Sequence, residues 1–274
     1  MGALRFILFG LFLLALTPAH CMASAWLDVV FDREVPEPAR ANIGRAIDTT
    51  NDLLAKYKVT LREPIQIIIT SDLESYTQAR MLYLKESRTE ADKLSATSGG
   101  VSSGTKPLII VRGSPALNNA PQEAFRVIPH EVFHQVQRQY GRTGTVTWLT
   151  EGAPEVFRMV AQEAAGFGRV SDYLTRAEKR VRVAPVIPDA REIATFNYAT
   201  WTAMMQKHYP VYDMAVLMTD QLSQGNGFEN IIFFYQMLHM GTEREKAFVA
   251  AFRVPMSWFL ADMNGYFDKL RSSR

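Results

Sequence analysis

The order of apolar and polar positions divides the chain into an N-terminal part of alternating strand and helix patterns and a C-terminal part that is helical. Residues 25–32 alternate apolar and polar side chains, as a strand with one buried face does. Residues 64–70 and 108–113 are β-branched runs of strand length. Apolar residues recur at helical spacing over residues 37–57 and 73–85. Between them and the last strand, residues 95–107 are rich in small side chains and indicate a loop or a weak edge strand.

From residue 119 onward the spacing of apolar residues predicts helices almost throughout, separated by segments rich in glycine and proline. These helices are expected to begin near Pro121, Trp148, Val170, Glu192, Tyr212, Phe228, Glu243 and Pro255. The pattern predicts an α+β protein with a β-rich lobe over about residues 26–118 and a helical lobe over about residues 119–274.

The first 25 residues have the three-part layout of a secretory signal peptide. Arg5 precedes an apolar run from Phe6 to Leu16, and a segment of small and polar residues then ends at Ala25. The apolar run is shorter than the roughly 20 residues that a membrane span needs. We therefore expect cleavage near Ala25, export to the periplasm or the medium, and no stable insertion of the mature chain into a membrane.

Composition narrows the possible functions. The 274 residues are 47% hydrophobic and 21% charged, with a formal net charge of +2, so nothing indicates a nucleic acid as partner. Cys21 is the only cysteine and would leave with the signal peptide. The mature chain would then have no disulfide and no thiol nucleophile, and export without disulfides favours a bacterial source.

The segment "HEVFH", residues 130–134, is the main candidate for chemistry. In a helix, His130 and His134 lie on the same face and can bind one metal ion, while Glu131 lies beside that face and could accept a proton from a water molecule at the site. Glu151, in "TWLTEGAPEVF", is the candidate third ligand, since sixteen residues between His134 and Glu151 suffice for a turn and a second helix. Glu155, one helical turn later, could orient a liganding histidine.

Two prolines bear on these helices. Pro129 removes the amide that would bond to Phe125, so the helix is expected to kink or to begin anew just before His130. Pro154 is compatible with a helix that starts near Thr150, because amides of the first turn have no helical partner.

With "WLTEGAPE" at residues 148–155, the HEVFH motif resembles the gluzincin metallopeptidases, and most of all the peptidase MA-like proteins and the gluzincin aminopeptidases. Residues 211–238 and 245–267 are also similar to helices of that family, so the resemblance covers roughly residues 95–270. It implies a zincin-like fold, in which the active-site cleft lies between a small mixed-sheet lobe and a helical lobe. It also implies a Zn²⁺ ion on His130, His134 and Glu151, and Tyr212 as the group that stabilises the oxyanion.

The resemblance implies hydrolysis of a peptide or protein substrate, but one family feature differs. The aminopeptidases hold the substrate's amine with a glutamate on an edge strand, whereas residues 99–103 read "GGVSS" and place Ser102 there. An uncharged hydroxyl does not replace a carboxylate as counter-ion, so aminopeptidase specificity is not expected. The alternative to an enzyme is a non-catalytic zincin-like binding or structural module. His208 and His239 are expected to be packing or surface residues.

Overall fold

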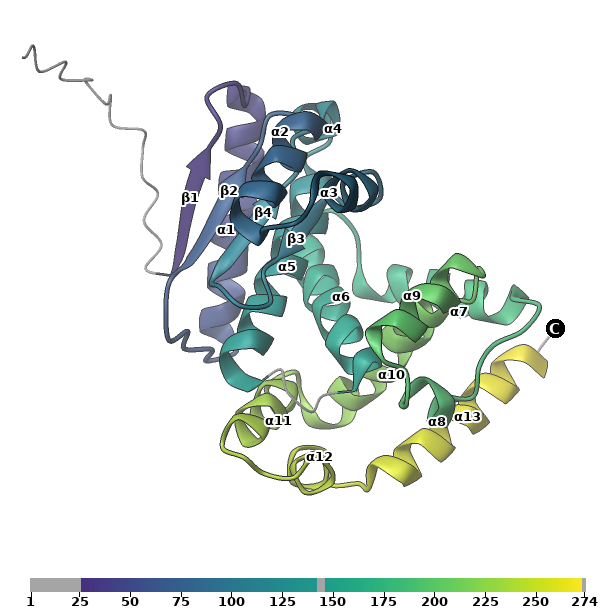
Figure 1. Ribbon diagram of the computed structural model, residues 1–274. Helices are drawn as coiled ribbons and strands as arrows, with labels where there is room; N and C mark the ends of the chain where they lie inside the picture. Colours follow the sequence, from purple (N-terminus) through teal and green to yellow (C-terminus); the bar gives the residue numbers. More distant parts are fainter. Residues whose placement is uncertain (1–25, 142–145, 273–274) are drawn as a thin grey trace, which may run out of the picture.

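The computed structural model describes residues 26–141 and 146–272 (Figure 1). The predicted signal peptide lies outside these residues. The structure confirms the predicted α+β class, since many helices surround one small mixed sheet. Within the described ranges, no helix combines the length and the apolar character that crossing a bilayer requires.

The sheet has four strands in the order β1-β2-β4-β3. Their bounds are Leu27–Phe31 for β1, Ile65–Ile69 for β2, Gly100–Ser102 for β3 and Leu108–Val111 for β4. The first three strands in this order run parallel, and β3 pairs antiparallel with β4. β2 and β4 are central. β4 is buried along its whole length, whereas β2 buries Ile65, Ile67 and Ile69 and exposes Gln66 on the other face. The short β3 lies at an edge and has one strand neighbour.

Helices cover both faces of the sheet (Figure 1). One face carries α1, Glu37–Lys56, and α5, Gln122–Gly141. The other face carries α2, Leu73–Ala79, which continues into the π-helix η1, Arg80–Leu84, and is followed by α3, Arg88–Ser95. The short α4, Pro115–Asn119, leads from β4 towards α5. The sequence predicted a single helix over residues 73–85, and the structure replaces its second half with the wider π turn.

The C-terminal part consists of helices and begins with α6, Thr147–Ala164. The others are α7, Val170–Val183; α8, Ala190–Ile193; α9, Tyr198–Gln206; α10, Val211–Asn226; α11, Glu229–His239; α12, Arg244–Phe252; and α13, Met256–Ser272. α6 lies between α5 and α10, so it connects the sheet-covering helices to the C-terminal ones. One continuous hydrophobic core runs through both parts.

Both prolines lie inside helices. Of the two alternatives expected at Pro129, the new start is wrong, and the expected start of α6 near Thr150 is corrected. α5 runs through Pro129 without beginning anew. α6 begins at Thr147, before the expected Thr150, so Pro154 lies well beyond its first turn. Burial explains this tolerance, because Pro129 and Pro154 both lie in the packed interfaces of their helices, where tertiary contacts offset the lost helical hydrogen bonds.

Candidate metal centre

His130 and His134 project from the same side of α5, as helical periodicity requires. Their side chains are 15% and 20% exposed, and their Nε2 atoms lie 3.1 Å apart. Two ligands of a tetrahedral zinc, each about 2.05 Å from the ion, lie about 3.3 Å apart. The two imidazoles therefore already have the spacing of a metal-binding pair.

Glu151 reaches the same point from α6. Its side chain is 8% exposed, and its Oε2 atom lies 3.9 Å from Nε2 of His134. One ligand atom from each of the three residues lies within 4.8 Å of the other two, so the group could hold a metal ion. The structure thus brings together His130, His134 and Glu151.

Gly152 determines how closely α6 approaches α10 next to this carboxylate. A Cβ atom at Gly152 would lie 2.5 Å from the carbonyl oxygen of Ala215 and 2.3 Å from Oγ1 of Thr219, both on α10. Only a glycine permits this separation. The close contact places the first turn of α10, which carries Tyr212, beside Glu151.

Glu155 lies against the far nitrogen of His130. Its Oε1 atom is 2.8 Å from Nδ1 of His130, and its Oε2 atom is 2.5 Å from Nη2 of Arg158. Burial alone would raise the pKa of Glu155, but the His130 and Arg158 contacts outweigh it and lower the pKa to about 2. For His130, burial favours the neutral ring, yet Glu155 and the nearby Glu131 and Glu151 raise its pKa. The Glu155 carboxylate favours a proton on Nδ1 of His130, which leaves Nε2 of the same ring available to a metal.

Gln137 orients the second histidine, and the sequence analysis missed it. Its Oε1 atom lies 2.9 Å from Nδ1 of His134, while its Nε2 atom donates to the carbonyl of Thr150 at 3.0 Å and to the hydroxyl of Tyr235 at 2.8 Å. Pro154 lacks the amide that would bond to the Thr150 carbonyl in a regular helix, and Gln137 donates there instead. The sequence contained a signal for this contact. Gln137 follows His134 by three residues, and Pro154 leaves the carbonyl of Thr150 without its usual helical amide partner.

Tyr212 contacts the carboxylate of Glu151. Its hydroxyl donates to Oε2 of Glu151 at 2.7 Å, and its ring makes an edge contact with Trp201. Burial, followed by the charge and hydrogen bond of Glu151, raises the pKa of Tyr212 far above its ordinary value. The phenol therefore stays protonated and remains a hydrogen-bond donor at any physiological pH.

Glu131 lies between α5 and the edge strand β3. A Cβ atom at Gly100 would lie 3.1 Å from its Cγ atom and 2.6 Å from Val127, so the glycine allows the strand to approach α5 here. Tyr198, at the start of α9, was also missed. It is 71% exposed, and partial burial of its phenol, followed by the charges of Glu151 and Glu131, raises its pKa.

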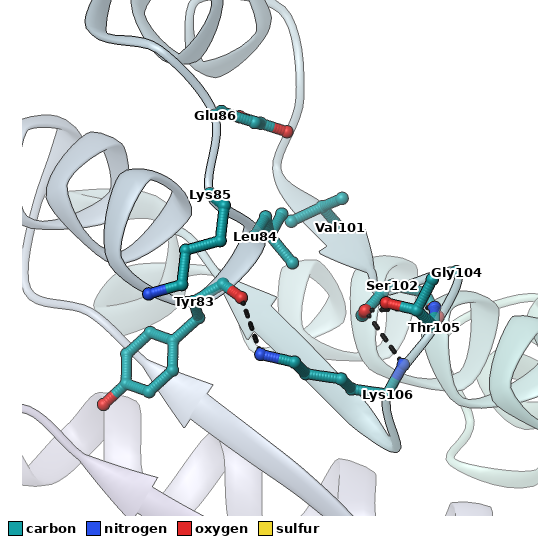
Figure 2. Close-up of a pocket in the computed structure, with 10 residues that line it drawn as sticks. Tyr83, Leu84, Lys85, Glu86, Val101, Ser102, Gly104, Thr105 and Lys106 are labelled. Atoms are coloured by element: carbon teal, nitrogen blue, oxygen red, sulfur yellow. Dashed lines mark hydrogen bonds between the residues drawn. The ribbon is translucent and has the colours of Figure 1, made fainter.

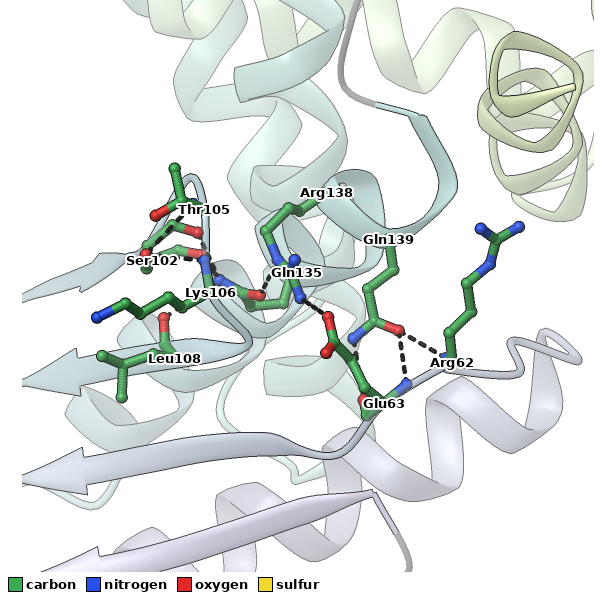
Figure 3. A network of polar contacts seen from close by, with 10 residues as sticks. Arg62, Glu63, Ser102, Thr105, Lys106, Leu108, Gln135, Arg138 and Gln139 are labelled. Atoms are coloured by element: carbon green, nitrogen blue, oxygen red, sulfur yellow. Dashed lines mark hydrogen bonds and ion pairs between the residues drawn. The ribbon is translucent and has the colours of Figure 1, made fainter. Parts of the chain in front are cut away.

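A polar network ties the edge strand to α5 (Figure 3). Gln135 is fully buried, and its Nε2 atom donates to Oγ of Ser102 at 2.6 Å and to the carbonyls of Ser103 and Leu108. Arg138 donates to Oε1 of Gln135 at 2.7 Å. The hydroxyl of Ser102 thus serves to hold β3 beside the helix that carries the histidines.

The other two histidines of the described chain lie apart from this centre. His208 follows α9 with a positive φ of 61° and is exposed. His239, at the end of α11, lies with Nε2 2.5 Å from Nη1 of Arg62. Neither belongs to the group that could hold a metal ion.

None of the protein-family models matches the chain, and the search of curated proteins found no significant match.

Proposed function

We propose that the protein is a zinc-dependent metallopeptidase of the gluzincin type, with a zincin-like cleft between the sheet lobe and the helical lobe. The observation that carries the proposal is the convergence of two imidazoles and one carboxylate with Glu131 beside them. Two nitrogens and one oxygen are the donor set of many catalytic zinc sites, which keep the fourth position open. A purely structural site would gain nothing from an adjacent unliganded glutamate.

His130, His134 and Glu151 would hold the ion. When bound, zinc would polarise the scissile carbonyl and lower the pKa of water at the open position. Glu131 would accept the proton from that water and pass it to the leaving amine. Glu155 and Gln137 would hold the two imidazole rings in orientation.

Tyr212 would stabilise the oxyanion that develops on the substrate carbonyl. Its phenol is protonated, which an oxyanion donor requires. In the metal-free geometry this proton is donated to Glu151. To donate to the substrate oxyanion, the hydroxyl would have to turn from Oε2 of Glu151 towards the open side of the site.

The substrate would be an extended peptide paired with the free edge of β3. Backbone pairing to an edge strand binds many sequences and leaves selection to side-chain pockets. Because the Ser102 hydroxyl is held by Gln135 and carries no charge, the strand offers no counter-ion for a free amine. We therefore propose cleavage that does not depend on the substrate's amino terminus. The pattern of residues 1–25 supports action in the periplasm or the medium.

The test is the Glu131→Gln variant, assayed on internally quenched peptides after the protein is loaded with zinc. The variant should bind zinc as the native protein does, yet lose activity by about two to four orders of magnitude, because the proton acceptor is gone. His134→Ala is the matched comparison and should lose the metal itself, as elemental analysis would show. Native protein that binds zinc but cleaves no peptide would instead identify a non-catalytic module.

A further inference from the structure

A pocket of about 280 Å³ opens beside the edge strand, on the face opposite α5 (Figure 2). One wall is formed by η1 and the residues after it, and the other by β3 and the turn that leads to β4. Its lining consists of residues 83–86 and residues 101–106. It lies outside the candidate metal centre, and the roles proposed above do not use it.

The alternation of side chains along β3 connects this pocket to the metal centre. Gly100 and Ser102 face α5, where they meet Glu131 and Gln135, while Val101 faces the opposite side and packs beside Leu84. A strand added to this edge would alternate in the same way. A peptide on this edge that points one side chain towards α5 would therefore point the next side chain along its own chain into the pocket.

The charges of the pocket are unbalanced. Its one carboxylate, on Glu86, is bound by both Nε and Nη2 of the buried Arg80 at 2.7 and 2.8 Å and is thereby neutralised. Lys85 and Lys106 have no such partner: among the described residues no carboxylate pairs with either ammonium group. Lys106 extends across the pocket to the carbonyl of Tyr83, at 3.3 Å.

The backbone of this wall is unusual as well. The π turn of η1 ends at Lys85, which has a φ of 64°, a conformation that costs a lysine energy. π-turns and positive-φ residues of this kind occur preferentially at functional sites. Here they bring the lysine and the neutralised Glu86 to the rim of the pocket.

We propose that this pocket is a subsite for an acidic side chain, Asp or Glu, of an extended peptide paired with β3. The assignment rests on the proposed function for the nature of the ligand, but its charge selectivity comes from Lys85 and Lys106 alone. A glutamate in the pocket would replace water at the ammonium group of Lys106, while Lys85 adds positive charge at the rim and Glu86 stays paired with Arg80.

The experiment uses internally quenched octapeptides with Glu, Gln or Lys fixed at each position in turn, cleaved by the zinc-loaded protein. At one position relative to the cleaved bond, Glu should give about fivefold higher kcat/KM than Gln, the order expected for an exposed ion pair. Lys106→Glu should reverse the preference towards Lys. Lys85→Asn, which suits the left-handed backbone, should remove most of it. Lys93→Glu, on α3 outside the pocket, makes the same charge change as Lys106→Glu and should leave the preference intact.

Fluorescence anisotropy of the same peptides, labelled and bound to the Glu131→Gln protein, separates the two proposals. Cleavage without discrimination between Glu and Gln at any position would overturn the subsite and leave the hydrolase standing. Binding that discriminates, with no cleavage by native protein, would retain the subsite and overturn the hydrolase. If the native protein cleaves no peptide and no binding discriminates between Glu and Gln, both the subsite and the hydrolase are overturned.

Discussion

The Gln137→Leu substitution tests whether Gln137 orients His134 for metal binding or only stabilises α5. The substitution keeps the approximate volume but removes three contacts, which join Gln137 to His134, Thr150 and Tyr235. At about 1 kcal/mol for each hydrogen bond, the free energy of unfolding should fall by about 3 kcal/mol. For a chain of this size that lowers Tm by about 6–12 °C.

The effect on the metal should be larger than stability alone would produce. Without an acceptor at Nδ1, the His134 ring loses its preferred tautomer and orientation, and zinc affinity should fall by about 10- to 100-fold. Competition between the protein and a fluorescent chelator measures that affinity, and thermal denaturation of the metal-free protein measures the stability.

Gln139→Leu is the matched control because Gln139 also makes three side-chain contacts, with the backbone of Arg62 and Glu63, and none with a metal ligand (Figure 3). It should lower Tm by a similar amount and leave zinc affinity unchanged. Equal loss of zinc affinity in both variants would show that destabilisation of α5 is the cause. Native affinity in Gln137→Leu would refute the orienting role directly.

Two further perturbations test the packing and the electrostatics of the centre. Gly152→Ala should destabilise the protein by about 1–3 kcal/mol in urea unfolding, since the new methyl group would overlap Ala215 and Thr219 unless α6 and α10 separate; an unchanged midpoint would contradict the close contact. Zinc affinity should fall by up to about tenfold per pH unit below the pKa of His130, which Glu155 raises against the effect of burial, because a proton must leave before the metal binds. Titrations between about pH 5 and pH 8 would measure this slope, and a flat profile would exclude proton competition at His130.

Periodicity alone was sufficient to place the histidines on one face of a helix, because that spacing depends only on local geometry. Placing Glu151 near them required the assumption of a turn between two neighbouring helices. The structure agrees with this assumption, because α5 and α6 pack side by side. Local rules failed at Pro129 and Pro154, where packing overrides helix propensity. Helical spacing alone did not identify Gln137, because two of its partners, Thr150 and Tyr235, lie 13 and 98 positions further along the chain.

In the N-terminal lobe, too, some elements were predicted from the sequence and others were not. Strands β2 and β4 were predicted from their β-branched runs, since central strands with many buried residues leave a strong signal. The small-residue segment before β4 contains the edge strand β3, as one of the two expectations for it proposed. The π turn was not foreseen, because its sequence is indistinguishable from that of an ordinary amphipathic helix.

The contact of α6 with α10 at Gly152 also bears on which ions the site would accept. α6 packs between α5 and α10, and this packing fixes the donor atoms. The ligands therefore cannot spread to the six to eight oxygens that Ca²⁺ prefers, nor to the octahedral shell of Mg²⁺. Imidazole nitrogens instead favour late first-row metals, and by the Irving–Williams order Cu²⁺ would be the strongest competitor for such a site. A protein built in this way would discriminate against the abundant alkaline-earth ions outside a cell by the rigidity of its helix packing.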